Sequence, residues 1–501
     1  MAEGAPTRPI TWTIAGSDSG GGAGIQADLH AFQTLGTHGC SVVTALTAQN
    51  SKAVTHIQYA SEENLRASLA ALDEDLPAKA IKLGMLGTES VINVVAEYLE
   101  GLGGPGAGPP VVVDPVMIST SGSRLLDAAA EAALVARIFP RAAVLTPNRV
   151  RSRAGGTRRR RCWAAQRAGA FLEEGQRSVL LKGGHLHEGG PWAQDYWTDG
   201  GGSLSMWLTS PRADHPNTHG TGCTMSSAIA ACMAQGFDIE DAVTIAKAYI
   251  TQGLGAAARL GSGPGPVAHT SWPCDPGALP WATSTAARGQ HRPEFPPCQA
   301  PEEWGLYPIV DSADWVERLV LMGVKDIQIR IKDKGDDEIM EAVGRAQAAC
   351  SAAGARLWVN DHWRAAVRHK TYGCHLGQED LMENLEGIDE LSAAGIRLGL
   401  STHCYSELAR AVAVRPSYVS LGPIYQTFSK QVRFAPRGLE NLKQWRKLVD
   451  VPLIAIGGIT YENAPKVIEA GADSIAVISA ITKENDVQAA IDMWNKVFLS
   501  P

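Results

Sequence analysis

The chain has 501 residues, of which 45% are hydrophobic and 19% charged, and its formal net charge is -7 at pH 7. Single hydrophobic cores stop growing at roughly 250–300 residues, so this length excludes a one-domain protein and predicts at least two domains. The net charge excludes an overall attraction to nucleic acid or anionic lipid, and no apolar run approaches the roughly 18–20 residues of a membrane-spanning helix, so we expect small-molecule partners, no nucleic acid and no membrane.

The first segment, from residue 11 to about 269, alternates two kinds of run. Residues 111–113 and 179–181 are apolar and rich in β-branched side chains, whereas residues 128–137 and 226–235 are rich in alanine. Strand and helix signals in alternation are typical of βαβ units. The segment is therefore predicted to be an α/β domain around a mainly parallel sheet.

Two glycine-rich loops and a lysine in this segment suit a phosphorylated ligand. The strand 11–15 runs into the glycine-rich loop 16–24, and a second loop, 217–224, precedes an alanine-rich helix. Small residues at a helix N-terminus leave N–H groups facing one point, which favours an anion, and Lys182 at the end of an apolar strand is costly unless it meets a phosphate. Tightly packed turns and a surface lysine are the alternatives.

Proline dominates the stretch between residues 261 and 301. Because proline fixes φ and removes a backbone donor, we expect a linker there. The predicted boundaries are a first domain at 1–269, a proline-rich linker at 270–304 and a second domain at 305–501.

Short strands followed by polar or glycine-rich residues fill the second segment. Such a series, over about 195 residues, predicts a compact (β/α)₈ barrel. The predicted strands are 306–310, 327–329, 357–359, 397–400, 418–421, 453–456 and 474–478, with another short strand near His375.

Charged side chains gather after several of these strands. Gln328, Arg330 and Lys332 alternate at the β period and should point the same way, which fits an anionic ligand. Asp361 and Asp380 follow two other strands, and two carboxylates at strand ends can hold a Mg²⁺ shared with a diphosphate. An exposed edge strand and helix-capping aspartates are the alternatives.

Several motifs of the first segment make it resemble hydroxymethylpyrimidine (phosphate) kinase of the ribokinase superfamily, which implies a three-layer α/β/α fold. The motifs are residues 15–28 (AGSDSGGGAGIQAD), 47–50 (TAQN), 82–86 (KLGML), 113–117 (VDPVM), 182–185 (KGGH) and 219–223 (HGTGC). The resemblance implies that the pyrimidine is bound by Gln49, Met85 and Asp28. It also implies catalysis by Cys223 and Lys182, with ATP phosphates held by Asn148, Lys182, Gly220, Thr221 and Gly222.

The sequence departs from this family after Asn148. The family has a glutamate three residues later, which helps to hold Mg²⁺-bound water, whereas Arg151 stands here and opens a run of six arginines over residues 151–161. An arginine cannot coordinate a cation. The alternative is therefore a chain in which the first domain binds pyrimidine without phosphorylating it.

The second segment resembles thiamine phosphate synthase, through residues 401–403 (STH), 422–430 (GPIYQTFSK) and 455–459 (AIGGI). The resemblance implies a pyrimidine diphosphate site of Gln328, Arg330, Lys332, Asn360, Ser401 and Lys430, with Ser401 and Lys430 also catalytic. It implies a thiazole phosphate site of Thr427, Ser429, Gly458, Ile478 and Ser479. Mg²⁺ would be held by Asp361 and Asp380.

These resemblances predict a bifunctional transferase of thiamine biosynthesis. The first domain would phosphorylate hydroxymethylpyrimidine and its monophosphate with Mg²⁺ and ATP, and the second would join the diphosphate to thiazole phosphate. A non-catalytic vitamin-binding protein is the alternative from another class. We expect a homo-oligomer. Nine cysteines without a Cys-x-x-Cys pair favour a reducing compartment and hence a cytoplasmic protein, with a plastid address as the alternative.

Overall fold

The computed structural model describes residues 8–104, 106–116, 126, 128–148, 178–184, 190–201, 203–213, 216–286, 294–300, 304–383, 385–427 and 434–499. The predictions for Arg151 and the arginine run, Ser429 and Lys430 lie outside these residues. The chain divides into two units, Met1–Gly289 and Gln290–Pro501, and each is described by itself.

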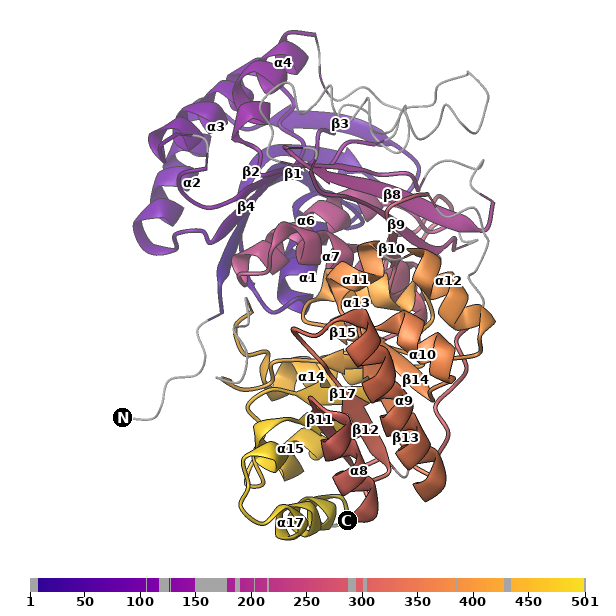
Figure 1. Ribbon diagram of the computed structural model, residues 1–501. Helices are drawn as coiled ribbons and strands as arrows, with labels where there is room; N and C mark the ends of the chain where they lie inside the picture. Colours follow the sequence, from indigo (N-terminus) through magenta and orange to yellow (C-terminus); the bar gives the residue numbers. More distant parts are fainter. Residues whose placement is uncertain are drawn as a thin grey trace. The chain divides into compact units, whose positions relative to one another are not determined.

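A sheet of ten described strands forms the centre of the first unit (Figure 1). The strands are β1 (Ile10–Asp18), β2 (His38–Gln49), β3 (Val54–Tyr59), β4 (Ala80–Leu83), β5 (Val111–Val113), β6 (Val144–Leu145), β7 (Ser178–Leu181), β8 (Trp192–Asp199), β9 (Ser205–Pro211) and β10 (Trp281–Thr283). Their order is β10-β9-β8-β7-β6-β5-β4-β1-β2-β3. The predicted parallel arrangement is confirmed from β7 to β2, whereas β3 and β8 to β10 are antiparallel at the two edges.

Helices cover both faces of this sheet, as the three-layer prediction requires (Figure 1). One face carries α1 (Gly24–Thr34), α6 (Thr221–Ala234) and α7 (Ile239–Gly255), and the other carries α2 (Glu62–Asp75), α3 (Glu89–Gly101) and α4 (Ala128–Ala133). Short turns of helix lie at Leu134–Ile138, Phe139–Arg141 and Pro276–Ala278. Helix α6 is buried from Thr224 to Cys232 because it packs on the sheet while α1 and α7 flank it. Its buried N-terminal end can therefore face a ligand at the sheet.

The second unit is a closed barrel of eight described parallel strands in chain order. The strands are β11 (Leu306–Val310), β12 (Asp326–Ile329), β13 (Arg356–Asn360), β14 (Gly373–Leu376), β15 (Arg397–Thr402), β16 (Tyr418–Leu421), β17 (Leu453–Ile456) and β18 (Ser474–Val477). The predicted (β/α)₈ barrel is confirmed. Because a closed barrel has no edges, the alternative of an exposed edge strand at Gln328 is excluded.

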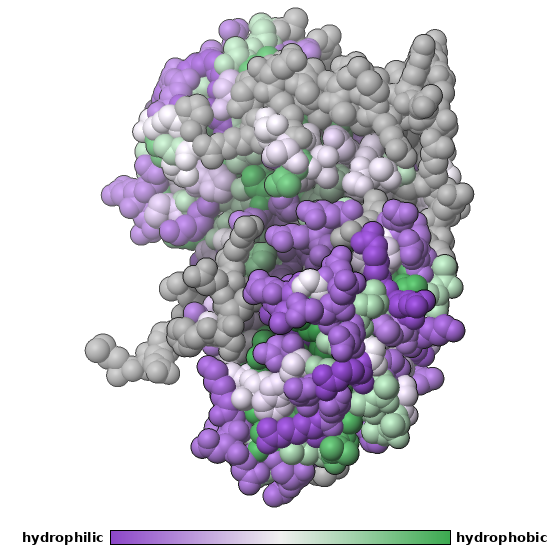
Figure 2. Space-filling model, in the orientation of Figure 1, coloured by the Kyte–Doolittle hydropathy of each residue, from purple (hydrophilic) through white to green (hydrophobic). Residues whose placement is uncertain are grey.

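Helices alternate with the barrel strands. They are α8 (Ala313–Leu321), α9 (Asp336–Ala353), α10 (Trp363–His369), α11 (Gln378–Glu383), α12 (Leu385–Ala393), α13 (Tyr405–Val412), α14 (Gly438–Arg446), α15 (Ala464–Glu469), α16 (Ser479–Thr482) and α17 (Val487–Leu499). In α9 the buried positions Ile339, Val343, Ala346 and Cys350 recur at helical spacing, so one face meets the barrel and the rest faces water. Figure 2 accordingly shows mostly hydrophilic side chains on the described surface of this unit in that view.

Aromatic rings fill the barrel interior. Trp358 and Tyr418 meet edge to face with centroids 4.7 Å apart, and Trp304 and Tyr307 pack beside them. Glycine makes the room, since a Cβ on Gly399 would lie 2.1 Å from the Tyr418 ring. Buried hydroxyls are thereby placed inside an otherwise apolar core.

The range predicted as a linker, 270–304, is divided between the units. Strand β10 pairs with β9 and extends the first sheet. Residues 294–300 instead cross the amino-terminal end of the barrel, where Ser417 Oγ donates to the Pro296 carbonyl at 2.7 Å and the Gln299 amide donates to Tyr372 OH at 2.7 Å. Proline here therefore accompanies ordered packing at both ends of the range. Within the described residues, no helix is long and apolar enough to cross a membrane.

Candidate active sites

A cavity of about 680 Å³ opens where the parallel strands of the first unit end. Both glycine-rich loops line it, together with the residues that follow β5, β6 and β7. Carboxyl ends of parallel strands are where open α/β sheets bind ligands. The predicted residues that line it are Gln49, Met85, Asn148, Lys182, Gly220, Thr221, Gly222 and Cys223.

The two glycine-rich loops pack against each other, backbone on backbone. Gly24 has φ +59°, and a Cβ there would lie 2.3 Å from the Gly16 carbonyl oxygen. Gly220 has φ +78°, and a Cβ there would lie 1.8 Å from the Gly22 carbonyl oxygen. Neither position can take a side chain. Tight packing, the alternative raised for each loop, is thus the means by which both reach one cavity.

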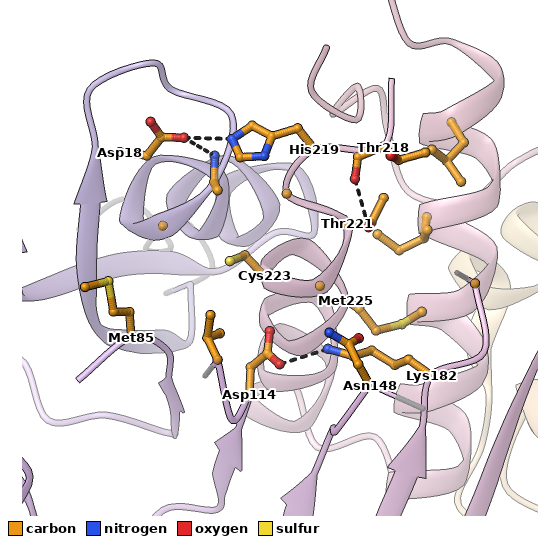
Figure 3. A pocket seen from close by; sticks show the side chains of 18 of the residues that line it. Asp18, Met85, Asp114, Asn148, Lys182, Thr218, His219, Thr221, Cys223 and Met225 are labelled. Carbon is orange, nitrogen blue, oxygen red and sulfur yellow. Dashed lines mark hydrogen bonds and ion pairs between the residues drawn. The ribbon is translucent and has the colours of Figure 1, made fainter. Parts of the chain in front are cut away.

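A histidine joins these loops at the rim of the cavity. His219 Nε2 lies 3.1 Å from Asp18 Oδ2 (Figure 3). It also lies 3.4 Å from Gln49 Nε2. The Asp18 carboxylate also accepts the amides of Gly20 and Ala23. The side chain predicted to read the pyrimidine, Gln49, therefore sits beside a fixed Asp18–His219 pair.

Cys223 lies at the start of α6, between the Asp18–His219 pair and the Asp114–Lys182 pair (Figure 3). The residue is partly exposed, and its thiol accepts a hydrogen bond from the Gly24 amide. Burial raises the pKa of the thiol, and the charge of Lys82 lowers it by less. Cys223 is therefore a protonated thiol at neutral pH rather than a nucleophilic thiolate.

Lys182 lines the cavity and also forms an ion pair with the Asp114 carboxylate. Its Nζ lies 2.8 Å from Asp114 Oδ1, and both side chains are buried. A Cβ on Gly222 would lie 3.3 Å from Asp114 Oδ2 and 3.3 Å from Lys182 Nζ, so this pair adjoins the loop at the start of α6. Asn148 and Lys182 are held side by side by a parallel β-bridge. The predicted phosphate ligands thus converge.

Asp28 is placed differently from the prediction. It is fully buried and does not line the cavity, and its carboxylate accepts Thr13 Oγ1, Ser227 Oγ and Lys82 Nζ at 2.6, 2.6 and 2.7 Å. Burial lowers the pKa of Lys82, but the Asp28 carboxylate outweighs it and the pKa is raised. Asp28 therefore holds a charged lysine at the cavity floor, and a pyrimidine cannot reach it.

Removing this buried carboxylate is expected to destabilise the first unit strongly. Asp28→Ala leaves the Lys82 ammonium buried without its counter-ion, a change that costs about 3–5 kcal/mol. The exposed pair Arg66–Glu97, at 2.6 Å, supplies the control, since Glu97→Ala should cost less than about 1 kcal/mol. Urea unfolding of the full chain measures both, and equal losses would contradict the assignment.

A third buried ion pair was not predicted. Lys247 Nζ, from α7, lies 2.8 Å from Asp195 Oδ2, and Asp195 Oδ1 accepts the Gly183 amide at 2.7 Å. Both Lys247 and Asp195 line the cavity. Because Gly183 follows Lys182, this pair fixes the turn that carries the predicted phosphate lysine.

In the second unit, the described site residues stand at the carboxyl ends of the barrel strands. Those from β12, β13 and β15 are Gln328, Arg330, Lys332, Asn360, Asp361 and Ser401. Asp380 lies in α11 after β14. Thr427, Gly458, Ile478 and Ser479 follow β16, β17 and β18. This end is where (β/α)₈ enzymes carry their chemistry.

Lys332, Asp361 and Asp380 form a charged cluster there. Lys332 Nζ lies 2.6 Å from Asp361 Oδ2, and the Asp361 and Asp380 carboxyls lie within hydrogen-bonding reach. Burial opposes ionisation of Asp361, but Lys332 outweighs it and the pKa is lowered, whereas burial and the Asp361 charge raise the pKa of Asp380. The described residues contain no group of three acidic, histidine or cysteine side chains suited to a metal. Two carboxylates alone suit Mg²⁺, which keeps waters and substrate phosphates as its other ligands.

Arg330 points to an anionic ligand. The side chain is partly buried, yet in the described part of the chain its guanidinium has no hydrogen bond or ion pair. A partly buried cation without a counter-ion is unfavourable unless a ligand supplies one. The Arg330 amide donates to the Val310 carbonyl at 2.7 Å, which places its backbone at the strand end.

The predicted thiazole phosphate residues come from adjacent loops. Gly458 has φ +66°, and a Cβ there would lie 2.4 Å from the Gln426 carbonyl oxygen, so the loops after β16 and β17 touch. Thr427 is next to Gln426 in the chain. Ser479 begins α16 directly after Ile478, and β18 neighbours β17 in the barrel. Ser429 and Lys430 lie outside the described residues.

Ser401 is joined to the barrel interior by a histidine. His375 Nε2 lies 2.8 Å from Ser401 Oγ, and His375 Nδ1 lies 2.6 Å from Tyr418 OH. The sequence predicts a short strand near His375 and a metal ligand at Asp380, but no role for the histidine itself. The signal for this histidine was its place inside a buried strand, β14.

Comparison with known proteins assigns both units. The phosphomethylpyrimidine kinase family matches residues 18–268, half of the chain, and the thiamine monophosphate synthase family matches residues 306–481. Thiamine-phosphate synthase of Rhizobium etli is 51% identical over 190 residues, which cover 38% of this chain and 92% of that relative. The chain belongs to both families.

Two further known proteins are each similar to one unit of the chain. Thiamine-phosphate synthase of Escherichia coli O1:K1 / APEC is 48% identical over 201 residues, covering 40% of this chain and 93% of that relative. A solved phosphomethylpyrimidine kinase from Clostridium difficile 630 is 35% identical, with a TM-score of 0.41, and covers 49% of this chain and 99% of that one. The family matches do not favour the alternative in which only the barrel is active.

The kinase–synthase is therefore an enzyme of thiamine biosynthesis that carries a kinase and a second transferase on one chain. The sequence named most of the side chains that the structure gathers at the cavity of the first unit and at the carboxyl end of the barrel. It gave no role to Lys82, Asp114 or His219, although each lies in a quoted motif, or to His375, which lies in a predicted strand.

Proposed function

We propose that the first unit transfers phosphate from Mg-ATP to hydroxymethylpyrimidine and then to its monophosphate. The carrying observation is the convergence of Lys182, Gly222 and the start of α6 on one cavity. Amide groups at a helix start and a lysine can hold a phosphoryl group in transfer. Mg²⁺ would offset phosphate charge, and the Asp114 carboxylate, which lines the cavity beside Lys182, could hold it.

The remaining cavity residues would bind and orient the pyrimidine. Gln49, at the end of β2, can hydrogen-bond its polar edge, and Met85 can pack on the ring. The Asp18–His219 pair lies against the Gln49 side chain, with His219 Nε2 3.4 Å from Gln49 Nε2. Cys223 would adjoin the hydroxymethyl group as a neutral thiol. Asp28 then contributes by keeping Lys82 charged at the cavity floor.

The raised pKa of Cys223 predicts slow alkylation. Because the reactive form is the thiolate, a pKa above the usual 9.0 leaves little of it at pH 7, and the rate should rise only in more alkaline solution. The exposed Cys274 of the same chain is the control. Mass spectrometry after timed iodoacetamide treatment measures both sites. Labelling of Cys223 as fast as Cys274 at pH 7 would contradict the neutral thiol.

For the second unit we infer that the barrel mouth joins pyrimidine diphosphate to thiazole phosphate. The carrying observation is Arg330, a partly buried cation without a partner among the described residues, beside the Lys332–Asp361–Asp380 cluster. Mg²⁺ held by Asp361 and Asp380 would neutralise the diphosphate. The diphosphate would be bound, as it departs from the pyrimidine methylene, by Arg330, Lys332, Asn360 and Ser401. Its departure leaves a cation at the methylene carbon, which the thiazole nitrogen captures.

The thiazole phosphate would bind at the neighbouring loops. Thr427, Gly458, Ile478 and Ser479 lie after the last three strands, a frequent phosphate position in such barrels. Ser429 and Lys430 belong to the same proposal by their motif. Homo-oligomerisation and a cytoplasmic location stay predictions.

A two-part assay on the purified full-length protein tests both proposals. In one part hydroxymethylpyrimidine and ATP are supplied with Mg²⁺, and in the other the pyrimidine diphosphate and thiazole phosphate are supplied. Product is expected in both. Thiamine phosphate in the second part with no phosphorylation in the first would overturn the kinase proposal and leave a pyrimidine-binding first unit.

A further inference from the structure

We propose that His375 is a positioning residue that, through a hydrogen-bonded chain buried in the barrel, fixes the Ser401 hydroxyl as a donor toward the diphosphate. The inference deepens the proposed synthase function and rests on it. Its basis is an unbroken series of polar atoms that connects two predicted diphosphate ligands, Gln328 and Ser401, through the aromatic core.

The hydrogen-bonded series consists of four contacts between side chains. Gln328 Nε2 donates to Tyr307 OH at 3.1 Å, and Tyr307 OH lies 3.1 Å from Tyr418 OH. Tyr418 OH lies 2.6 Å from His375 Nδ1, and His375 Nε2 lies 2.8 Å from Ser401 Oγ. All of these side chains are buried except Ser401, which is partly exposed at the mouth. Such a buried network is favourable only when its donors and acceptors match.

The number of protons available at Ser401 determines which atom donates in each hydrogen bond of the series. A diphosphate offers only acceptors, so a serine that binds it must donate, and a hydroxyl has one proton. Ser401 therefore cannot also donate to His375. The short contact to His375 must instead be donated by His375 Nε2–H.

The direction then continues from His375 to the far end of the series at Gln328. Because neutral imidazole carries one proton, His375 Nδ1 is then an acceptor and Tyr418 donates to it. Tyr418 in turn accepts from Tyr307, whose own oxygen accepts from Gln328 Nε2–H. The orientation of the Gln328 amide and the needs of an anionic ligand thus agree on one arrangement.

If every hydrogen bond of the series ran in the opposite direction, Ser401 could not donate to the diphosphate. If Nδ1 carried the proton, Ser401 would have to donate to Nε2 and would face the diphosphate with lone pairs only. Mutation of a partner that orients a ligand-binding group typically costs about 10–100-fold in activity.

Two substitutions of His375 distinguish the hydrogen bond made by Nδ1 from the one made by Nε2. Asparagine at 375 reaches only the position of Nδ1, so it keeps Tyr418 and loses the donor to Ser401. Glutamine reaches the position of Nε2 and can still donate to Ser401. We expect His375→Asn to lower kcat/KM for the pyrimidine diphosphate about 10–100-fold, with little change in KM for thiazole phosphate, and His375→Gln to restore much of the loss.

A double-mutant cycle gives the decisive readout. In a Ser401→Ala background the donor to residue 401 has no target, so His375→Asn should cost less than about 3-fold more. Equal costs in both backgrounds would overturn the proposal, as would an asparagine variant more active than the glutamine variant. His369→Asn, in α10 of the same unit, is the control for the loss of a histidine and should leave both KM values unchanged.

A spectroscopic measurement keeps the inference separate from the activity. In the full-length protein labelled with ¹⁵N-histidine, the resonance that disappears in His375→Asn should show a protonated Nε2 and a bare Nδ1. Protonation at Nδ1 would overturn the inference even if thiamine phosphate is made. A wild-type protein that makes none would overturn the proposed synthase function alone.

Discussion

Asp361→Asn is expected to lower the rate of thiamine phosphate formation about 10²–10³-fold, the size of effect seen when one preorganised charge stabiliser is removed. The carboxylate is one of the two oxygen donors that we propose for Mg²⁺ at the barrel mouth. It also holds Lys332 at 2.6 Å, so its loss frees one diphosphate ligand while weakening the metal site. Rates should be measured over a range of Mg²⁺ concentrations, where half-maximal activity should require more metal.

The choice of asparagine removes a conformational ambiguity. Asp361 has φ +63°, and asparagine tolerates this left-handed conformation better than alanine. Asp333 provides a matched control, since it has φ +58° and is exposed. It follows β12, whereas the proposed metal ligands Asp361 and Asp380 follow β13 and β14. Asp333→Asn changes the charge equally and should leave the Mg²⁺ requirement alone. Identical behaviour of the two variants would remove Asp361 from the metal site.

The position of the proposed ligands at the barrel mouth was largely predictable because local patterns determine it. Arg330 and Lys332 come within three residues of the end of β12, and Asp361 directly follows β13. In a parallel barrel every strand delivers its following residues to one end, so naming the strands was enough to gather the side chains. The prediction needed no knowledge of which side chains touch.

Partners distant in sequence could not be found in that way. Lys182 was expected to meet a phosphate because a buried ammonium needs an anion, but the carboxylate of Asp114, 68 residues away, already pairs with it. Lys82 and Asp28 are 54 residues apart, and their contact converts a predicted pyrimidine ligand into a buried counter-ion. Desolvation physics predicts that a partner exists, whereas only the packing of strands identifies it.

His375 shows the same limit inside the barrel. The strand around it reads as apolar, and nothing local reveals that Tyr418, 43 residues later, will face its ring. The proline-rich range 270–304 is a different case. Proline excludes regular helix but permits extended backbone packed against a domain, so composition alone could not separate a free spacer from β10 and the segment at the base of the barrel.

Gly222→Ala is expected to abolish most kinase activity while leaving the fold intact. The new methyl group would lie 3.3 Å from both Lys182 Nζ and Asp114 Oδ2, in the space proposed for the transferring phosphoryl group. Crowding there should lower kcat/KM for phosphorylation about 10²-fold or more, as when one donor to a transition-state oxyanion is lost. Synthase activity of the same protein should be unchanged.

Stability separates this effect from misfolding. Gly222 lies in the first turn of α6 without a positive φ, so alanine is compatible with its backbone and favours the helix by up to about 1 kcal/mol. Gly101→Ala, where a Cβ meets nothing within 4 Å, is the control for an added methyl group and should keep full kinase activity. A Gly222→Ala protein that unfolds no earlier than wild type yet phosphorylates poorly would locate phosphoryl transfer at the start of α6. Full activity in that variant would place the phosphate elsewhere in the cavity.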